Sequence, residues 1–317
     1  IGTNNNPDML KLQAELAPKL SAYSDAITLN GKLYARVKAL YDQRDSLGLD
    51  AESKRLLERY HTDFVREGAQ LNDADKATLK DINAKLAGLQ TTFSQNVQKE
   101  VNAAAIVVDR KEDLAGMSDS DIAAAAAVAK ARGMEGKYVI ALLNTSGQPA
   151  LDSLDNRALR ERIQKASIAR GSQGGEFDNR AVFAEIVKLR AQRAKLLGYG
   201  NHAEYVLEDA TARTTGAVNK MLFSLAPAAV ANAKKEAADM QKVVDAEKGK
   251  FQLAAWDWSY YAEKVRKAME WFAKSFPELN NPTERTLFLA FVGRRLGGRE
   301  LAGQHAHPGE GQDAVLQ

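Results

Sequence analysis

Residues 73–101, DADKATLKDINAKLAGLQTTFSQNVQKEV, form the stretch of this sequence that decides the fold class. Its large apolar side chains recur every three or four residues, at Leu79, Ile82, Leu86, Leu89, Phe93 and Val97. Because an α-helix has about 3.6 residues per turn, this spacing places them on one face of one helix. The positions between them are mostly polar, small or charged. The pattern therefore predicts a long amphipathic helix whose apolar face packs in a core.

Helical spacing continues on both sides of this stretch. Upstream, a first helix is predicted, and Pro18 is expected to kink or end it because proline removes a backbone donor. Met9, Leu12, Leu16 and Leu20 are predicted to form one apolar face of this helix. A second helix is expected to stop at Gly48. Asp50 is expected to cap a third, whose inward side chains are Leu56, Leu57, Tyr60, Phe64 and Val65. Further helices are predicted at about residues 119–132, 151–170, 178–197, 203–210 and 215–248.

Two short runs interrupt the helical pattern. Residues 105–109 and 137–143 are apolar or β-branched and bounded by turn residues, so a short strand is predicted in each. Ser118 is expected to cap the helix between them. The fold class predicted is all-α, mostly helical with two short strands, in one elongated helical domain over residues 1–268. Residues 269–317 are predicted to be a divergent tail, disordered from Gly297 onward because apolar patterning stops there.

The composition excludes several classes of protein. Acidic and basic residues alternate along most of the chain and leave a net charge of +3, so no nucleic-acid partner is expected. Cysteine is absent, which excludes disulfides and cysteine-bound zinc. No apolar run approaches the ~20 residues that span a bilayer, so no membrane partner is expected. The first residue, Ile1, is not methionine, so the natural N-terminus is expected to be missing. The expected compartment is the cytoplasm, with the periplasm as the alternative.

Two motifs match patterns of known binding sites: a glycine-rich loop and a Glu-His pair. Residues 198–203, GYGNHA, match the pattern G-x-G-x-x-A of dinucleotide sites, but a predicted helix ends at Leu197 where those sites need a strand. The glycines are therefore interpreted as a helix C-cap and turn. Glu58 and His61 have the spacing of di-iron ligands, but the chain holds no second Glu-x-x-His. His61 is interpreted as a surface histidine beside Tyr60.

No complete catalytic set is found in the remaining motifs. His305, His307 and Glu310 could hold an adventitious metal ion, in a tail where nothing fixes ligand geometry. His202 and Glu204 do not follow the His-Glu-x-x-His order of zinc peptidases. A nucleophile elbow and a phosphate loop are also missing. No catalytic, cofactor-binding or metal-binding residue is therefore assigned, and this chain is not expected to bind a cofactor.

An aromatic segment at residues 251–268, FQLAAWDWSYYAEKVRKA, places four large aromatic residues within six positions. Asp257 lies between Trp256 and Trp258 and is interpreted as the N-cap of a helix that starts at Ser259 or Tyr260. The alternative is a carboxyl group whose pKa is raised by desolvation between the two indoles.

This aromatic segment resembles the zinc peptidases related to thimet oligopeptidase, and most closely the bacterial peptidyl-dipeptidases (dipeptidyl carboxypeptidases). Further segments resemble the same family in the same order, at residues 29–37, 46–50, 142–151, 190–198 and 243–245. The resemblance covers about residues 8–268. It stops at Ala268, and residues 269–317 show no match.

The resemblance implies a channel fold in which this chain is the N-terminal helical half. In that family a His-Glu-x-x-His helix on the other half binds zinc, and short oligopeptides are the substrates. None of the zinc ligands has a counterpart here, so the chain is expected to be inactive alone. The alternative is a non-enzymatic binding or scaffold protein derived from the same family. Apolar surface that the missing half would cover is expected to be exposed, with self-association as a consequence.

Overall fold

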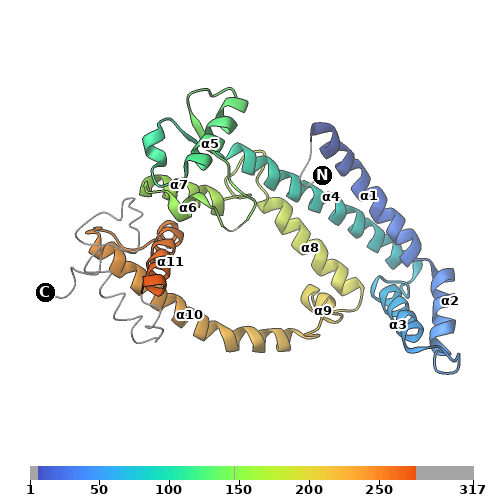
Figure 1. Ribbon diagram of the computed structural model, residues 1–317. Coiled ribbons are helices and arrows are strands. Elements are labelled where there is room, and N and C mark those ends of the chain that lie inside the picture. The colour runs from blue at the N-terminus through green and yellow to red at the C-terminus, as the bar shows by residue number, and fades with distance from the viewer. Residues whose placement is uncertain (1–5, 146, 276–317) are drawn as a thin grey trace. The chain divides into compact units, whose positions relative to one another are not determined.

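The computed structural model describes residues 6–145 and 147–275 (Figure 1). Within these ranges the chain forms eleven α-helices and only two short strands, which confirms the predicted all-α class. The described residues divide into two compact units, one of residues 6–104 and 169–224 and one of residues 105–168 and 225–275. The boundary expected at residue 268 remains a prediction. The disordered tail predicted from Gly297 onward lies outside the described residues. No helix in the described ranges is both long and apolar enough to cross a lipid bilayer.

The first unit is built on α4 (Asp73–Ala103), the helix predicted from residues 73–101. It packs against α1 (Pro7–Thr28) and α8 (Arg180–Leu196). A buried cluster joins α4 to α8 through Ile82, Leu86, Ile186 and Leu189. The unit also contains α2 (Gly31–Asp42), α3 (Ala51–Arg66), α9 (His202–Leu207) and the start of α10 (Thr215–Ala246). The apolar face of α4 is therefore buried, as its periodicity predicts.

The first helix continues through its internal proline and exposes part of its apolar face. Pro18 lies inside α1, which continues to Thr28, so of the two effects expected of this proline the helix end is wrong and the kink stays a prediction. Packing along α4 outweighs the local cost of one missing backbone hydrogen bond. Three residues of the predicted apolar face, Leu12, Leu16 and Leu20, are exposed. Polar groups instead meet α4: buried Asp25 accepts a hydrogen bond of 2.8 Å from Asn83.

The next two helices are confirmed with different ends and faces. α2 ends at Asp42, several residues before Gly48, where the helix was expected to stop. Asp50 caps α3 as predicted, because its carboxylate accepts from the backbone N–H of Ser53 at 2.7 Å. Phe64 is buried, but Leu56 and Tyr60 are exposed, so their inward assignment is wrong. α3 therefore buries a narrower apolar face than its sequence suggests.

A side-chain cap starts α4 and gives a first testable prediction. Asn72 accepts a hydrogen bond from the backbone N–H of Asp75 at 2.9 Å, which satisfies one of the unpaired donors of the first turn. Asn72→Ala should lower the free energy of unfolding by about 1 kcal/mol, measured by urea denaturation. Asn72→Asp, which keeps a cap acceptor, is the matched control. An alanine variant as stable as the parent would contradict the role of the cap.

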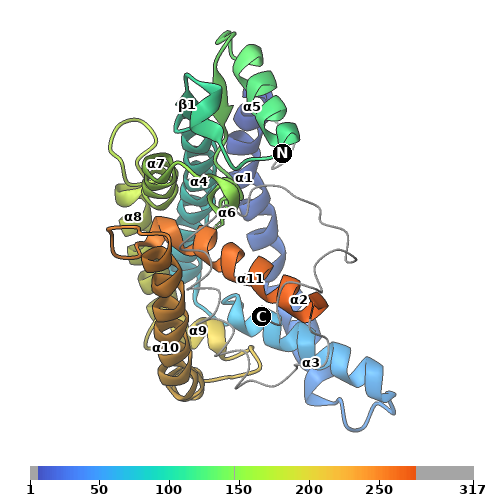
Figure 2. The ribbon, with the colours of Figure 1, turned by 60° about the vertical axis from the view of Figure 1, so that its left-hand side comes forward.

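The second unit contains the predicted strands and the remaining helices. β1 (Ile106–Val108) and β2 (Tyr138–Ile140) pair antiparallel, with Val107 opposite Val139. β2 packs on α5 (Asp119–Ala131), and Figure 2 shows α5 beside the strand region labelled β1. Ser118 caps α5 as predicted. The unit also includes the 3-10 helices η1 (Lys111–Leu114) and η2 (Ala255–Asp257), then α6 (Ala150–Ser153), α7 (Arg157–Ile168), α11 (Trp258–Ser275) and the rest of α10.

The single helix predicted over residues 151–170 is wrong, because the chain breaks between α6 and α7. Asn156 caps α7 by accepting from the backbone N–H of Leu159 at 3.1 Å. The Arg160 guanidinium donates to the carbonyl of Leu154 at 2.8 Å and to that of Asp155 at 3.0 Å. These carbonyls therefore bind a side chain where a continuous helix would use backbone N–H groups.

Candidate functional site

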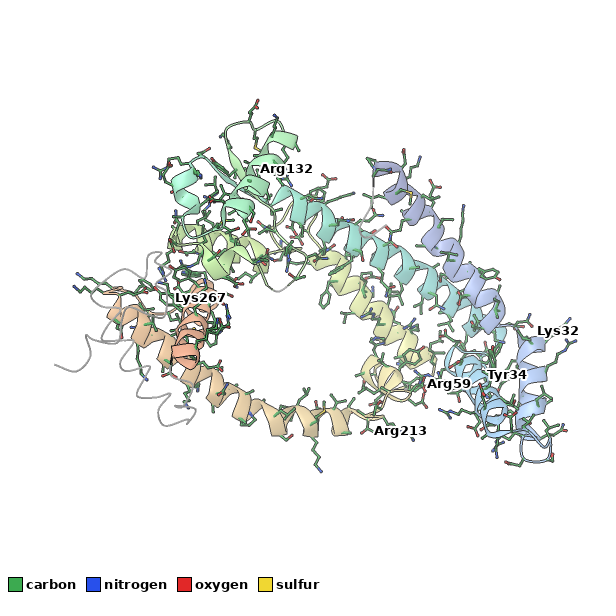
Figure 3. The ribbon with its side chains drawn as sticks, in the orientation of Figure 1. Lys32, Tyr34, Arg59, Arg132, Arg213 and Lys267 are labelled. Carbon is green, nitrogen blue, oxygen red and sulfur yellow. The ribbon has the colours of Figure 1, made fainter. Side chains whose placement is uncertain are left out.

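The pair Glu58 and His61 does not form a metal site. The imidazole of His61 stacks on the ring of Tyr41 with 3.8 Å between ring centroids, and its Nε2 lies 3.5 Å from the Tyr34 hydroxyl. Tyr34 is labelled on α2 in Figure 3. Glu58 pairs instead with Arg55 at 3.2 Å. Burial against the α2 side chains lowers the pKa of His61. His61 is partly exposed, and its ring contacts Tyr41 and Tyr34 of α2.

The second histidine in the described residues is also unsuited to bind a cation. His202 begins α9 and lies against the ring of Tyr205, and burial and the positive charges of Arg190 and Arg193 lower its pKa. Glu204 accepts a hydrogen bond from the Asn201 side chain at 2.7 Å. Across the ranges 6–145 and 147–275, no three His, Cys, Asp or Glu side chains converge as a metal site would require. His305, His307 and Glu310 lie outside the described residues.

The glycine-rich loop at residues 198–203 connects two helices. Gly198 has φ +88° and ends α8, where the N–H of Tyr199 donates to the carbonyl of Ala194 at 2.9 Å. Asn201 then caps α9 by accepting from the N–H of Glu204 at 3.0 Å. Because a helix and not a strand precedes the loop, the predicted C-cap and turn are confirmed.

The aromatic segment carries a buried charge cluster that was not predicted. Asp257 is 0% exposed, and its carboxylate accepts hydrogen bonds from two arginines of α7. Arg157 donates from Nε to both carboxylate oxygens at 3.1 Å and from Nη2 to Oδ2 at 2.9 Å. Arg160, itself 2% exposed, donates from Nη2 to Oδ1 at 2.9 Å. The backbone N–H of Ala254 supplies a further bond at 3.1 Å.

Aromatic rings enclose the two guanidinium groups of this cluster. The Arg157 guanidinium lies 4.1 Å from the ring centroid of Phe251, and that of Arg160 lies 4.1 Å from the ring centroid of Tyr260. The Tyr260 hydroxyl donates to Asp155 at 2.7 Å. Cation–π contacts of this kind are strongest where water is excluded. The aromatic residues of the segment therefore hold the arginines against Asp257.

The electrostatics of Asp257 indicate a structural role. Burial alone would raise the pKa of this carboxyl, but the hydrogen bonds from Arg157 and Arg160 outweigh burial and lower it. Asp257 is therefore a buried, ionised carboxylate held by two arginines, which is the arrangement of a structural ion pair. Asp257 directly precedes α11, which begins at Trp258, so it stands at the predicted N-cap position, but its carboxylate accepts hydrogen bonds from Arg157, Arg160 and the backbone N–H of Ala254.

The arginines were missed because nothing local marks them. Arg157 and Arg160 are three residues apart on one face of α7, about 100 positions before Asp257 in the chain. The signal for this cluster is the place of Arg160 on α7, where the apolar residues Leu159 and Ile163 flank it and are buried with it. Arginine is rarely buried without a partner, so this position predicts a carboxylate nearby without identifying it.

A second feature is the exposure of α10. Apolar residues between positions 221 and 230 are half exposed or more, at Met221, Leu222, Phe223, Leu225 and Val230. Met221, Leu222 and Phe223 are consecutive, so they point in three directions about 100° apart around the helix. A helix that is apolar on several sides normally lies inside a protein. This part of α10 has the apolar composition of a buried helix, but the described residues leave its large side chains exposed.

Comparisons with known proteins were consistent with the resemblance. The sequence pattern of peptidase family M3 matches residues 150–291, so the match continues past Ala268. The chain is 39% identical over 264 residues to a dipeptidyl carboxypeptidase of Escherichia coli K12. It is 32% identical over 267 residues to oligopeptidase A of the same organism. Each alignment covers 83% of this chain but 39% of the relative, so the chain spans about two fifths of the length of these relatives.

Proposed function

Because this chain belongs to peptidase family M3, with its family match over residues 150–291, we propose that it is the helical, non-catalytic part of a zinc peptidyl-dipeptidase. The whole enzyme would release C-terminal dipeptides from short oligopeptides. The higher identity to the dipeptidyl carboxypeptidase than to oligopeptidase A supports this activity. The role proposed for this part is to enclose the substrate and to exclude folded protein.

The observation that carries the proposal is the exposed apolar part of α10. Phe223 is 73% exposed, and its neighbours Leu222 and Leu225 are half exposed or more. Burial of one such side chain contributes ~1.5–3 kcal/mol, so leaving several in water is unfavourable. A further polypeptide segment of the kind that makes up the rest of the relatives' length would cover them.

Family M3 is zinc-dependent, and the described residues do not fit a catalytic zinc site. Three protein ligands with one open position are the usual requirement. Within residues 6–145 and 147–275 the histidines lie against tyrosine rings, on different helices. We therefore assign the zinc ligands of the whole enzyme to a segment outside the described residues.

A chimera tests the proposed function. The aligned segment of the E. coli dipeptidyl carboxypeptidase is replaced by this chain, and dipeptide release from a blocked peptide is followed by chromatography. We expect release by the chimera that a chelator abolishes, and no release by this chain alone. Phe223→Asp in the chimera should lower the rate at least about tenfold, since a buried unpaired charge disrupts packing. Asn219→Asp, at an exposed polar position one turn away, is the matched control.

Two results would contradict the proposal. A chimera that folds, by circular dichroism and light scattering, but releases no dipeptide would favour the scaffold alternative. Dipeptide release by this chain alone, if sensitive to a chelator, would mean that the chain carries its own zinc site.

A further inference from the structure

The helices α2 and α3 form a hairpin, here called the α2–α3 hairpin and comprising residues 31–66, that has a small apolar core. α3 packs beside α2 (Figure 1). The buried side chains between them are Tyr34 and Phe64, with Ala69 just after α3. Leu40 of α2 and Leu56 of α3 are instead 52% and 55% exposed. Because the apolar core is this small, the hairpin depends on polar contacts that a larger core would make dispensable.

A chain of hydrogen bonds runs through this core and ends at His61. The side-chain amide of Gln70 donates to the Tyr34 hydroxyl at 2.6 Å. The Tyr34 oxygen lies 3.5 Å from Nε2 of His61, at the long end of the hydrogen-bond range. Because the Tyr34 oxygen already accepts from Gln70, its own hydrogen can point to His61. That donation needs a lone pair on Nε2, so the chain is complete only when the imidazole is neutral.

The ring of Tyr41 also favours a neutral His61. The imidazole stacks on this ring at 3.8 Å between centroids and 6° between planes, and Cζ of Arg44 lies over the same ring, 4.2 Å from its centroid. Two groups this close to one centroid must occupy opposite faces, because on one face they would overlap. Arg44 pairs only loosely with Asp45, at 4.0 Å, and stays positive at every pH of interest. A protonated His61 would therefore set a second cation against a ring that already carries one.

The other charges that act on His61 come from α2. Lys38 repels a positive imidazole and Asp42 attracts it, but these two groups pair with each other at 2.6 Å. On α3 itself, Glu58 is occupied by its own ion pair. Burial is the main cause that lowers the pKa of His61, and the repulsion from Lys38 and Arg44 adds to it. The surroundings of His61 thus favour its neutral form on both helices.

We propose that protonation of His61 loosens the α2–α3 hairpin, which makes this part of the first unit acid-sensitive. Protonation removes the acceptor for the Tyr34 hydrogen and adds a positive charge between the two helices. The folded state binds this proton less readily than the unfolded state, because the pKa is lower in the folded chain. Stability is therefore intact above the ordinary histidine pKa, falls as the pH drops below it, and levels off below the folded value.

Hydrogen–deuterium exchange of the full chain, followed by mass spectrometry, tests the inference. His61→Gln is the informative variant, because glutamine offers a neutral acceptor and cannot be protonated. The measured quantity is the exchange rate of the parent divided by that of the variant at the same pH, which cancels the intrinsic pH dependence of exchange. In residues 31–66 this ratio should rise at least about threefold between about pH 7.5 and about pH 5.5. In residues 73–103, the helix α4, it should stay constant.

Proton NMR of the His61 ring measures the titration itself, and the His61 resonance is the one that is missing in His61→Gln. Arg44→Gln removes the cation on the other face of Tyr41 and should raise the pKa of His61. Arg36→Gln removes an equal charge from an exposed site of α2 and is the matched control, which should leave that pKa unchanged. Tyr34→Phe should raise the pKa too, because it removes the donor to Nε2.

Three outcomes would overturn the inference. They are an exchange ratio in residues 31–66 that does not change with pH, a ratio that rises equally in residues 73–103, and a His61 whose pKa is no lower than that of an ordinary histidine. The second would indicate a loss of stability that is not confined to the hairpin. The inference does not depend on the proposed function, because neither measurement involves peptide hydrolysis.

Discussion

Asp257→Ala is expected to lower the free energy of unfolding by about 3–5 kcal/mol, because it leaves two arginines beside a buried site without their carboxylate. Arg160 is the main reason: it is 2% exposed, and its Nη2 bonds Asp257 at 2.9 Å. Arg157 is partly exposed and can recover water contacts. The loss therefore comes mainly from one buried, unpaired guanidinium.

Tryptophan fluorescence during urea unfolding measures this effect in the second unit. The three tryptophans of the chain are at positions 256, 258 and 271, all in that part of the sequence. Asp239→Ala, which breaks the exposed pair of Asp239 with Lys242, is the matched control and should change stability by less than about 1 kcal/mol. Equal effects of the two substitutions would contradict the role of the buried cluster.

The contribution of Asp257 should also depend on pH. Its pKa in the folded chain is lowered from the ordinary value, because the hydrogen bonds from Arg157 and Arg160 outweigh burial. The folded state therefore binds this proton less readily than the unfolded state does. The stabilisation is present above the ordinary aspartate pKa and is lost as the pH falls through the lower, folded value. The stability difference between the parent and Asp257→Ala should accordingly shrink below about pH 4.

Gly116→Ala is expected to cost about 2–5 kcal/mol, the sum of backbone strain and overpacking. Gly116 has φ +90°, a conformation that favours glycine. A Cβ atom there would collide with the carbonyl oxygen of Ser153 and lie 2.9 Å from Cγ of Asp155. The backbone cannot move away easily, because the N–H of Asp155 donates to the carbonyl of Ala115 at 2.8 Å.

Gly133→Ala separates the two causes of this loss. Gly133 also has a positive φ, +72°, but nothing lies within 4 Å of its added Cβ. The free energy of unfolding of Gly133→Ala should therefore fall only by the cost of backbone strain, about 1–2 kcal/mol. Urea unfolding of both variants gives the comparison. If Gly116→Ala were no more costly than Gly133→Ala, the close approach of residues 115–116 to residues 153–155 would be wrong.

The sequence predicts elements well where the determining forces are local. The apolar period of residues 73–101 predicts α4, and Asp50 and Ser118 predict caps, since a cap depends on atoms three residues away. The two strands follow from short β-branched runs bounded by turns. The family resemblance, too, rests on the order of segments along the chain.

Burial and long-range pairing were decided by the tertiary structure. The period of α1 identifies an apolar face, but it cannot say whether a neighbour covers that face. In this chain α4 takes the polar side, and Leu20 stays exposed. The residues beside Asp257 in the sequence predict that it caps a helix, and only folding brings it to Arg157 and Arg160. By itself, then, the sequence determined the helices, their caps and the family, because these depend on nearby residues. The tertiary structure alone decided which apolar faces are buried and which charges pair, because both depend on segments far apart in the chain.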